Sequence, residues 1–252
     1  MNAYDLAGKR AIVTGGAGGF GVGVARALLA GGAVVELWDL SQDRLEAARA
    51  ELGPDRVSAR VVDITAEEQV EAAVAAFAAA GRIDALVNNA GVLGEVKPLW
   101  ETSPDDFRRV LEVNLVGSYL VARAVVGRML RQQPRPLRGH VVNMSSIQGK
   151  EGMPLAGAYA ASKAALLALT KTLAKETARE KIVVTAVTPA AAETAMAKLI
   201  SSERRAEIEA RIPAGRFVEV DEVARLVAWL CSDDCSFSTG GVFDISGGRA
   251  TY

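Results

Sequence analysis

Short apolar runs alternate with longer helix-forming segments along this chain of 252 residues. The apolar runs are rich in valine and are bounded by Gly, Asp or Asn, which is typical of buried strands. We expect seven of them, at residues 9–15, 33–39, 56–62, 83–88, 139–145, 182–187 and 241–245. Because helical segments separate the strands, the pattern predicts right-handed crossovers and a parallel sheet with helices on both faces. The predicted fold class is therefore α/β, with a doubly wound parallel sheet.

The predicted helices fill the intervals, at about 19–29, 41–52, 66–80, 103–131, 155–177, 193–211 and 221–231. Ser41 is placed to cap the second helix, and Pro104 lies in the first turn of the fourth. The polar segment at about 190–213 is an insert after the sixth strand, and we expect it to form a lid. No linker, low-complexity tract or repeat interrupts the pattern, so residues 1–252 are predicted to form one domain.

Composition and charge narrow the class of protein. Half of the residues are hydrophobic, and 29 basic residues balance 30 acidic ones for a net charge of −1. No basic stripe is evident, so we expect no nucleic-acid partner. No run approaches 18 apolar residues and the first ten residues do not resemble a signal peptide, so a cytoplasmic protein without a membrane span is predicted. The two cysteines, Cys231 and Cys235, with a single histidine, His140, favour free thiols over a metal site.

A glycine-rich tract, TGGAGGFG at 14–21, joins the first strand to the first helix. Glycines there let the backbone turn tightly and approach a pyrophosphate, which lies at the helix N-terminus. Two registers are open from the glycines alone. They are GxGxxG at Gly16, Gly18 and Gly21, and GxxxGxG at Gly15, Gly19 and Gly21.

Asp39 ends the second strand, 18 positions after Gly21. A carboxylate at this place accepts hydrogen bonds from the adenosine ribose and repels a 2′-phosphate, so it favours NAD over NADP. The tract itself contains no Lys or Arg, which agrees with this interpretation. The alternative is that Asp39 is an ordinary surface acid.

Tyr159 and Lys163 lie four residues apart in the sequence YAASK. On a helix this spacing places both side chains on one face. A nearby ammonium favours the phenolate, so we expect Lys163 to lower the pKa of Tyr159. The pair is then suited to exchange a proton with an alcohol or ketone. Chance spacing on an amphipathic helix is the alternative, and the other motifs are needed to choose.

Taken together, the motifs resemble the short-chain dehydrogenase/reductase family in its compact single-domain branch. The matching positions, in order, are TGGAGGFG at 14–21, Asp63 in VVDIT, NNAG at 88–91, Asn114 in EVNLVGSY, Ser146 in VNMSS and YAASK at 159–163. The resemblance selects the register Gly15, Gly19, Gly21. It also implies a Rossmann-type sheet of about seven strands in the order 3-2-1-4-5-6-7.

The resemblance implies an NAD-dependent oxidoreductase that interconverts a secondary alcohol and a ketone by hydride transfer. Ser146 would hold the substrate oxygen and Tyr159 would exchange its proton. Lys163 would bind the nicotinamide ribose, and Asn114 would hold a water that links Lys163 to solvent. A dinucleotide-binding sensor without turnover is the alternative from another class, and the intact Ser146, Tyr159 and Lys163 set argues against it.

The same resemblance assigns the cofactor-binding residues. They are Gly15, Gly19, Phe20, Gly21, Asp39, Leu40, Asp63, Ile64, Asn89, Ala90, Gly91, Tyr159, Lys163, Pro189, Ala192 and Thr194. One departure is Pro189-Ala190, where the family usually has proline-glycine. A positive φ at Ala190 would be costly, so the path of this loop is open. At Phe20 the family more often has isoleucine or leucine, which we interpret as a packing change.

In open parallel sheets the ligand lies beyond the carboxyl ends of the strands. This assigns the pocket to residues 92–100, 147–156 and about 191–213, and makes Gln148 and Met153 substrate contacts beside Ser146 and Tyr159. Their mixed polarity favours a small polar alcohol such as a sugar, polyol or hydroxy acid. A 3-oxoacyl thioester or a cyclic ketone is the alternative. The family resemblance implies a homotetramer.

Overall fold

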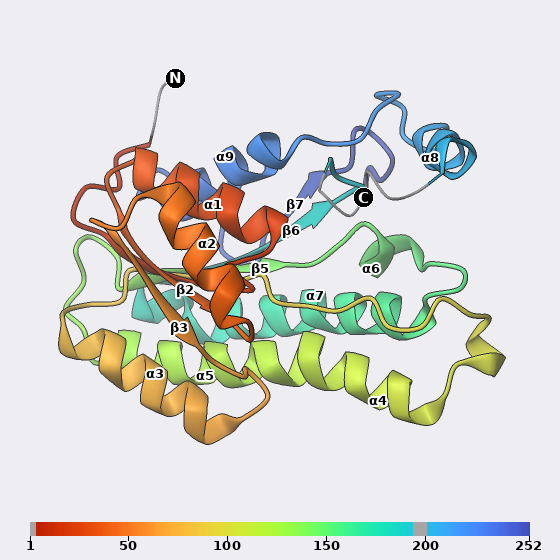
Figure 1. The fold of residues 1–252 in the computed structure, drawn as a ribbon. Helices are drawn as coiled ribbons and strands as arrows, with labels where there is room; N and C mark the ends of the chain where they lie inside the picture. The colour runs from red at the N-terminus through yellow and green to blue at the C-terminus, as the bar shows by residue number, and fades with distance from the viewer. Residues whose placement is uncertain (1–3, 194–200) are drawn as a thin grey trace.

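The computed structural model describes residues 4–193 and 201–252 and has a parallel sheet at its centre (Figure 1). The sheet contains seven strands in the order β3-β2-β1-β4-β5-β6-β7, as predicted. The strands are β1 (Arg10–Thr14), β2 (Val34–Asp39), β3 (Val57–Val61), β4 (Ala85–Asn88), β5 (Gly139–Met144), β6 (Ile182–Pro189) and β7 (Val242–Ile245). All neighbouring pairs are parallel. Their carboxyl ends therefore meet at one edge.

Helices cover both faces of the sheet (Figure 1). On one face lie α1 (Gly19–Ala30), α2 (Gln42–Leu52) and α9 (Val220–Leu230). On the other lie α3 (Glu67–Ala79), α4 (Pro104–Leu111), α5 (Ser118–Met129) and α7 (Gly157–Thr177). Two short helices, α6 (Gln148–Glu151) and α8 (Ser202–Glu209), follow β5 and β6, and single 3-10 turns occupy Leu99–Glu101 and Ala178–Glu180.

The core is divided into two clusters by the sheet. Side chains alternate across it, so Val13 and Leu37 pack toward α1 while Ile12 and Trp38 pack toward α3 and α5. Every residue of β5 is buried, since this central strand has helices on both sides. Double-sided burial explains why the strands appear in the sequence as continuous apolar runs.

The predicted helix at 103–131 is interrupted in the structure. A π-helical stretch, Glu112–Gly117, separates α4 from α5. The combined segment Pro104–Met129 is long and apolar enough to cross a membrane, with a mean hydropathy of 1.4 over its most apolar window. Half of that window is buried inside the protein, where α5 packs against α3 and the sheet. Core helices of folded domains pass the same test of length and composition, and this packing is that of a core helix.

Several other boundaries differ from prediction, among them the start of β4 at Ala85 and the end of β6 at Pro189. The helix that carries Tyr159 begins at Gly157 rather than at residue 155, because Leu155 has a φ of 70°, which a right-handed helix cannot include. The insert predicted at about 190–213 contains residues 194–200, which lie outside the described residues. Its described helix is α8, which is shorter than predicted, and its role as a lid stays a prediction.

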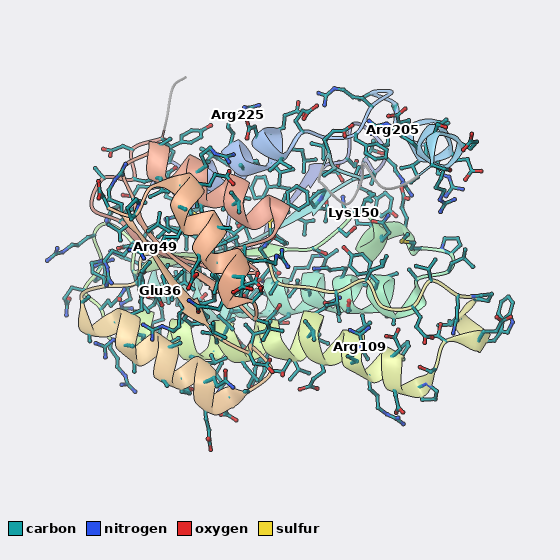
Figure 2. The ribbon with its side chains drawn as sticks, in the orientation of Figure 1. Glu36, Arg49, Arg109, Lys150, Arg205 and Arg225 are labelled. Atoms are coloured by element: carbon teal, nitrogen blue, oxygen red, sulfur yellow. The ribbon has the colours of Figure 1, made fainter. Side chains whose placement is uncertain are left out.

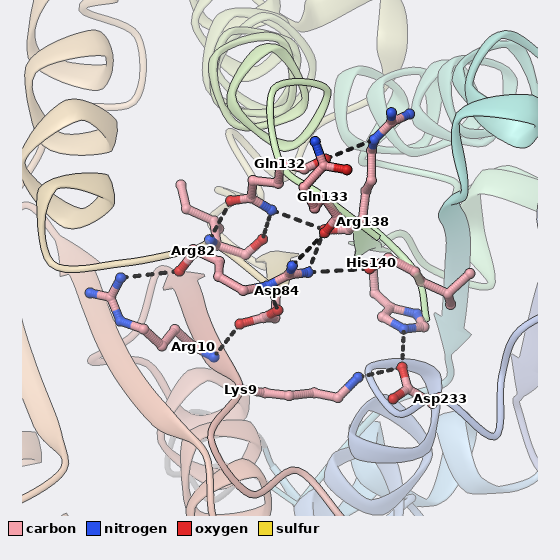
Figure 3. Close-up of polar contacts among 11 residues, drawn as sticks. Lys9, Arg10, Arg82, Asp84, Gln132, Gln133, Arg138, His140 and Asp233 are labelled. Atoms are coloured by element: carbon pink, nitrogen blue, oxygen red, sulfur yellow. Dashed lines mark hydrogen bonds and ion pairs between the residues drawn. The ribbon is translucent and has the colours of Figure 1, made fainter. Parts of the chain in front are cut away.

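A polar cluster lies at the edge of the sheet where the strands begin, opposite the edge formed by their carboxyl ends (Figure 3). Lys9 pairs with Asp233 at 2.6 Å, and Arg82 pairs with Asp84 at 2.6 Å. His140 is buried there, and its Nε2 atom is 3.8 Å from Asp233 Oδ1, which is too long for a hydrogen bond. Neither ring nitrogen has a hydrogen-bond partner. Cys231 and Cys235 follow the end of α9, and both are buried free thiols, as predicted.

Candidate active site

Helix α7 brings Tyr159 and Lys163 together beneath the end of β5. The Lys163 ammonium is 5.7 Å from the centre of the Tyr159 ring and donates a hydrogen bond of 2.7 Å to the Met144 carbonyl. Lys163 is buried, with 4% of its surface exposed, whereas Tyr159 is half-buried. The i, i+4 spacing therefore places both groups on one helix face, as predicted.

The prediction that Lys163 lowers the pKa of Tyr159 is wrong. Burial raises the pKa of the Tyr159 phenol, and the neighbouring Ser146 hydroxyl only partly opposes this effect. The Lys163 ammonium donates to the Met144 carbonyl and lies 5.7 Å from the centre of the Tyr159 ring. Burial also lowers the pKa of Lys163 from 10.5 to about 8. Loss of water around both groups is the dominant electrostatic effect here.

Ser146 lies directly after β5 and next to the Tyr159 phenol, whose pKa it acts to lower. Its hydroxyl donates to the side-chain oxygen of Gln148 and accepts the Gln148 backbone N–H at 3.2 Å. The neighbouring Ser145 is used differently, since its hydroxyl donates to the Lys163 carbonyl at 2.8 Å. The structure thus brings together Ser146, Tyr159 and Gln148.

Asn114 lies in the π-helical stretch and is fully buried. Its side chain accepts the Val92 N–H at 2.7 Å and donates to the Val92 carbonyl at 2.9 Å and to Ser162 Oγ at 3.0 Å. A Cβ atom added to Gly91 would lie 3.1 Å from Asn114 Oδ1 and 3.4 Å from Lys163 Nζ, so these groups are neighbours. Single π-turns inside α-helices are frequent at functional sites.

The glycine tract forms a tight turn from β1 into α1. Gly15 has a φ of 59°, and a Cβ atom there would lie 2.9 Å from Ala90 Cα. A Cβ atom on Gly21 would lie only 2.3 Å from the Gly15 carbonyl oxygen. Gly19 is the first residue of α1, and its N-cap, Gly18, makes no side-chain cap. The N–H groups of this helix terminus are therefore free to bind an anion.

Residues that directly follow β4 hydrogen-bond to the start of the glycine tract. The Asn89 side chain donates to the Thr14 and Gly15 carbonyls, both at 3.0 Å. The Asn89 and Ala90 N–H groups both bind the Thr14 hydroxyl, at 3.0 and 3.1 Å. Asn89 and Ala90 therefore hold the start of the glycine tract against the end of β4.

Asp39 lies beside this loop at the end of β2. Its carboxylate accepts the N–H groups of Leu40 at 2.9 Å, Ser41 at 3.4 Å and Ala17 at 3.3 Å. Leu40 is exposed, with 67% of its surface accessible. Arg44 in α2 donates to the Ala17 carbonyl at 3.0 Å, a contact that the sequence did not predict. Only the tertiary fold brings this cation against the loop, since the two residues are 27 positions apart.

The other predicted cofactor residues lie along the same edge. Asp63 follows β3 and accepts the Thr65 N–H at 2.9 Å and hydroxyl at 2.7 Å. Ile64 is buried, and Phe20 packs partly buried against the core around α1. Together with the glycine tract they extend across the carboxyl ends of β3, β2 and β1.

The loop after β6 accommodates alanine without strain. Among the described residues, only Leu155 and Lys181 have a positive φ without being glycine, so Ala190 is in an ordinary conformation. Pro189 ends β6, and its carbonyl accepts the Ile147 N–H at 3.0 Å. Ala192 forms a bridge to Val218. Thr194 lies outside the described residues.

Comparison with known proteins agrees with this geometry. A family model described as enoyl-(acyl carrier protein) reductase matches residues 15–250. A 2-dehydro-3-deoxy-L-rhamnonate dehydrogenase (NAD(+)) from Sphingomonas sp. is 41% identical over 99% of this chain and 98% of the relative. The chain belongs to the short-chain dehydrogenase/reductase family. The predictions of this family, of its Rossmann-type fold and of an oxidoreductase acting on CH–OH groups are confirmed.

Two solved structures are similar to this chain over nearly its whole length. NAD+-bound xylitol dehydrogenase has a TM-score of 0.89 and 33% identity, covering 96% of this chain and 99% of that one. A 3-ketoacyl-(acyl-carrier-protein) reductase from Brucella melitensis, complexed with NADH, has a TM-score of 0.91 and 34% identity, covering 98% and 100%. The relatives thus include enzymes named for polar sugar-like substrates and for acyl thioesters.

Proposed function

We propose that this chain is an NAD-dependent oxidoreductase that interconverts a secondary alcohol and a ketone on a small polar substrate. The observation that carries the proposal is the Ser146 hydroxyl beside the Tyr159 phenol, with Lys163 buried next to the Tyr159 ring. This group lies at the same sheet edge as the glycine tract. NAD, when bound, supplies the hydride acceptor, and the protein positions the reacting groups.

In the proposed reaction, residues of the protein exchange a proton with the substrate oxygen. Because burial keeps the pKa of Tyr159 above its usual value, the phenol is neutral at neutral pH and is ready to donate to a developing alkoxide. In the oxidation direction the same phenol must first lose its proton, and Lys163 remains mostly protonated at pH 7 with a pKa of about 8. Ser146 holds the substrate oxygen by hydrogen bonding. We assign Asn114 to the water link between Lys163 and solvent.

The residues fit an NAD molecule at the carboxyl edge. The uncapped N–H groups at the start of α1 suit a pyrophosphate, and Asp39 suits the adenosine ribose. Gly15, Gly19, Gly21, Asp63, the NNAG segment and the backbone after Pro189 complete the proposed set. Preference for NAD over NADP is supported by Asp39 and by the relatives named with NAD+ or NADH. Arg44 lies against the same loop, and kinetics with NAD+ and NADP+ measure the preference.

Gln148, which contacts Ser146, supports a substrate with a polar portion, such as a sugar, polyol or hydroxy acid. The first relative is a sugar-acid dehydrogenase by name, and one similar structure is a xylitol dehydrogenase. The second candidate is a 3-oxoacyl thioester, which the name of the Brucella relative favours.

We also propose a cytoplasmic homotetramer, supported by exposed small residues on α7, namely Ala161, Ala164 and Ala168. Small side chains of this kind permit close helix approach. Analytical ultracentrifugation of the purified protein measures the assembly state directly.

A panel assay tests the function. The purified protein is mixed with NAD+ or NADP+ and with polyols, aldonic acids and hydroxy acids, and nicotinamide absorbance is followed. Reduction of a 3-oxoacyl thioester with NADH is measured in parallel. We expect turnover with NAD+ and a polar alcohol, and loss of turnover in Tyr159→Phe without unfolding. Turnover of Tyr159→Phe within tenfold of wild type contradicts the assignment, and NAD binding without turnover on any substrate favours the sensor.

A further inference from the structure

The segment that carries the catalytic serine has little internal support. Ser146 leads into α6, a helix of only four residues, and its hydroxyl is held by the backbone and side chain of Gln148. Helices this short are unstable on their own, because nucleation is costly and few hydrogen bonds form. The position of α6, and with it the position of the Ser146 hydroxyl, therefore depends on what packs around it.

One side of α6 rests on the body of the fold. The Ile147 N–H donates to the Pro189 carbonyl at 3.0 Å, and Ile147 is fully buried. A Cβ atom on Gly149 would lie 2.8 Å from the Lys163 carbonyl carbon, so α6 is in close contact with α7. These contacts hold the beginning and middle of α6.

The other side of α6 is held by the last nine residues of the chain, which lie beside it (Figures 1 and 2). The Arg249 guanidinium binds the Glu151 carboxylate through two nitrogens, at 2.7 and 2.9 Å. Lys150 pairs with Asp244 at 3.3 Å, and the Tyr252 hydroxyl donates to the Lys150 carbonyl at 3.1 Å. The Lys150 ammonium is also 5.5 Å from the Tyr252 ring centre. Three residues of the terminal segment thus contact two residues of α6.

The terminal segment is itself fixed. Ser246 Oγ donates to Asp244 at 2.5 Å and accepts the Ala250 N–H at 3.0 Å. The buried Thr188 hydroxyl at the end of β6 contacts the same Asp244 carboxylate at 3.3 Å. In the ion pair, the Arg249 and Glu151 side chains are only 14% and 27% exposed. An ion pair that is made through two nitrogens and is this little exposed is stronger than a typical ion pair on the surface.

We propose that Arg249 is a positioning residue for catalysis, which holds α6 through Glu151 so that Gln148 keeps the Ser146 side chain in place beside Tyr159. This inference rests on the proposed role of Ser146. Small displacements of a reacting group cost one to two orders of magnitude in rate. We therefore expect Arg249→Ala to lower kcat about tenfold while the affinity for NAD stays within twofold of wild type.

A charge exchange tests whether the ion pair carries the effect. The double variant Glu151→Arg with Arg249→Glu restores the pair with reversed sign, and we expect kcat within about threefold of wild type. Glu180→Gln is the matched control, because Glu180 also binds an arginine, Arg138, but lies where β6 begins. We expect the control to leave kcat unchanged. Failure of the exchange to recover activity overturns the proposal, as does an Arg249→Ala kcat within twofold of wild type.

Hydrogen exchange provides a readout that needs no substrate. In Arg249→Ala the amides of residues 147–152 are expected to exchange at least tenfold faster, while those of α9 stay unchanged. Unchanged exchange in 147–152 overturns the proposal even if activity falls. If the wild-type protein turns over no substrate, the proposed function fails, and hydrogen exchange still decides whether Arg249 holds α6.

Discussion

Replacing Lys163 with methionine is expected to remove activity and yet stabilise the protein at neutral pH. The wild-type chain holds a charged ammonium in a buried position, which lowers the pKa of Lys163 from 10.5 to about 8. A difference of this size corresponds to about 3 kcal/mol that folding loses by burying the charge. Methionine has a similar length and no charge, so it avoids this loss.

One favourable contact opposes the gain. Lys163 donates a hydrogen bond of 2.7 Å to the Met144 carbonyl, and its loss costs about 1–2 kcal/mol. The net stabilisation expected at pH 7 is about 1–2 kcal/mol. In a chain of this size each kcal/mol raises Tm by about 2–4 °C.

The pH dependence has a definite sign. Because the folded pKa of Lys163 lies below the unfolded pKa, the unfolded state binds more protons between about pH 8 and 10.5, and wild-type stability rises across that window. Lys163→Met has no such group, so its advantage is lost within the window, and the wild type becomes the more stable protein by about 1–2 kcal/mol near pH 10.5. Urea unfolding of both proteins at pH 7, 8, 9 and 10 measures this difference.

Lys171→Met is the matched control, because Lys171 is exposed on the same helix. We expect it to change the free energy of unfolding by less than about 0.5 kcal/mol at every pH. A stability difference between wild type and Lys163→Met that does not vary with pH would refute the argument. The expected fall in kcat/KM for Lys163→Met is at least about 100-fold, as for loss of other charge-stabilising donors.

Three further changes test other parts of the structure. Gly21→Ala places a methyl group 2.3 Å from the Gly15 carbonyl oxygen, so we expect NAD affinity, measured by fluorescence titration, to fall at least about tenfold; unaltered binding would contradict the loop geometry. Burial lowers the pKa of His140 below 6.5, so its neutral form favours folding and stability should fall as the pH drops below 6.5. His140→Leu should flatten that decline in thermal unfolding, and an identical decline would exclude His140 as its source. Asp39→Asn should shift the ratio of kcat/KM for NAD+ over NADP+ toward NADP+ by about tenfold, and an unchanged ratio would remove Asp39 from cofactor selection.

Periodicity was sufficient to predict the strands of the parallel sheet, and the family resemblance implied their order. A strand such as β5 is buried on both faces, so its sequence is continuously apolar wherever the helices lie. Gly15 and Gly21 are likewise visible from sequence, since a turn this tight excludes a Cβ atom. The order of the family's motifs indicated Ser146. Spacing alone placed Tyr159 and Lys163 on one face of a helix.

Only the tertiary structure determined the pKa values of these residues and the long-range contacts around them. The pKa of Tyr159 is raised rather than lowered because the fold removes water from the phenol, and the i, i+4 spacing contains no information about burial. Contacts of Arg44 with the glycine loop and of Arg249 with Glu151 join residues 27 and 98 positions apart. Local sequence patterns extend over one or two helical turns, so they determine the helices and strands of this protein and which side chains share a face of each. Solvation and long-range contacts are set only when the elements pack together.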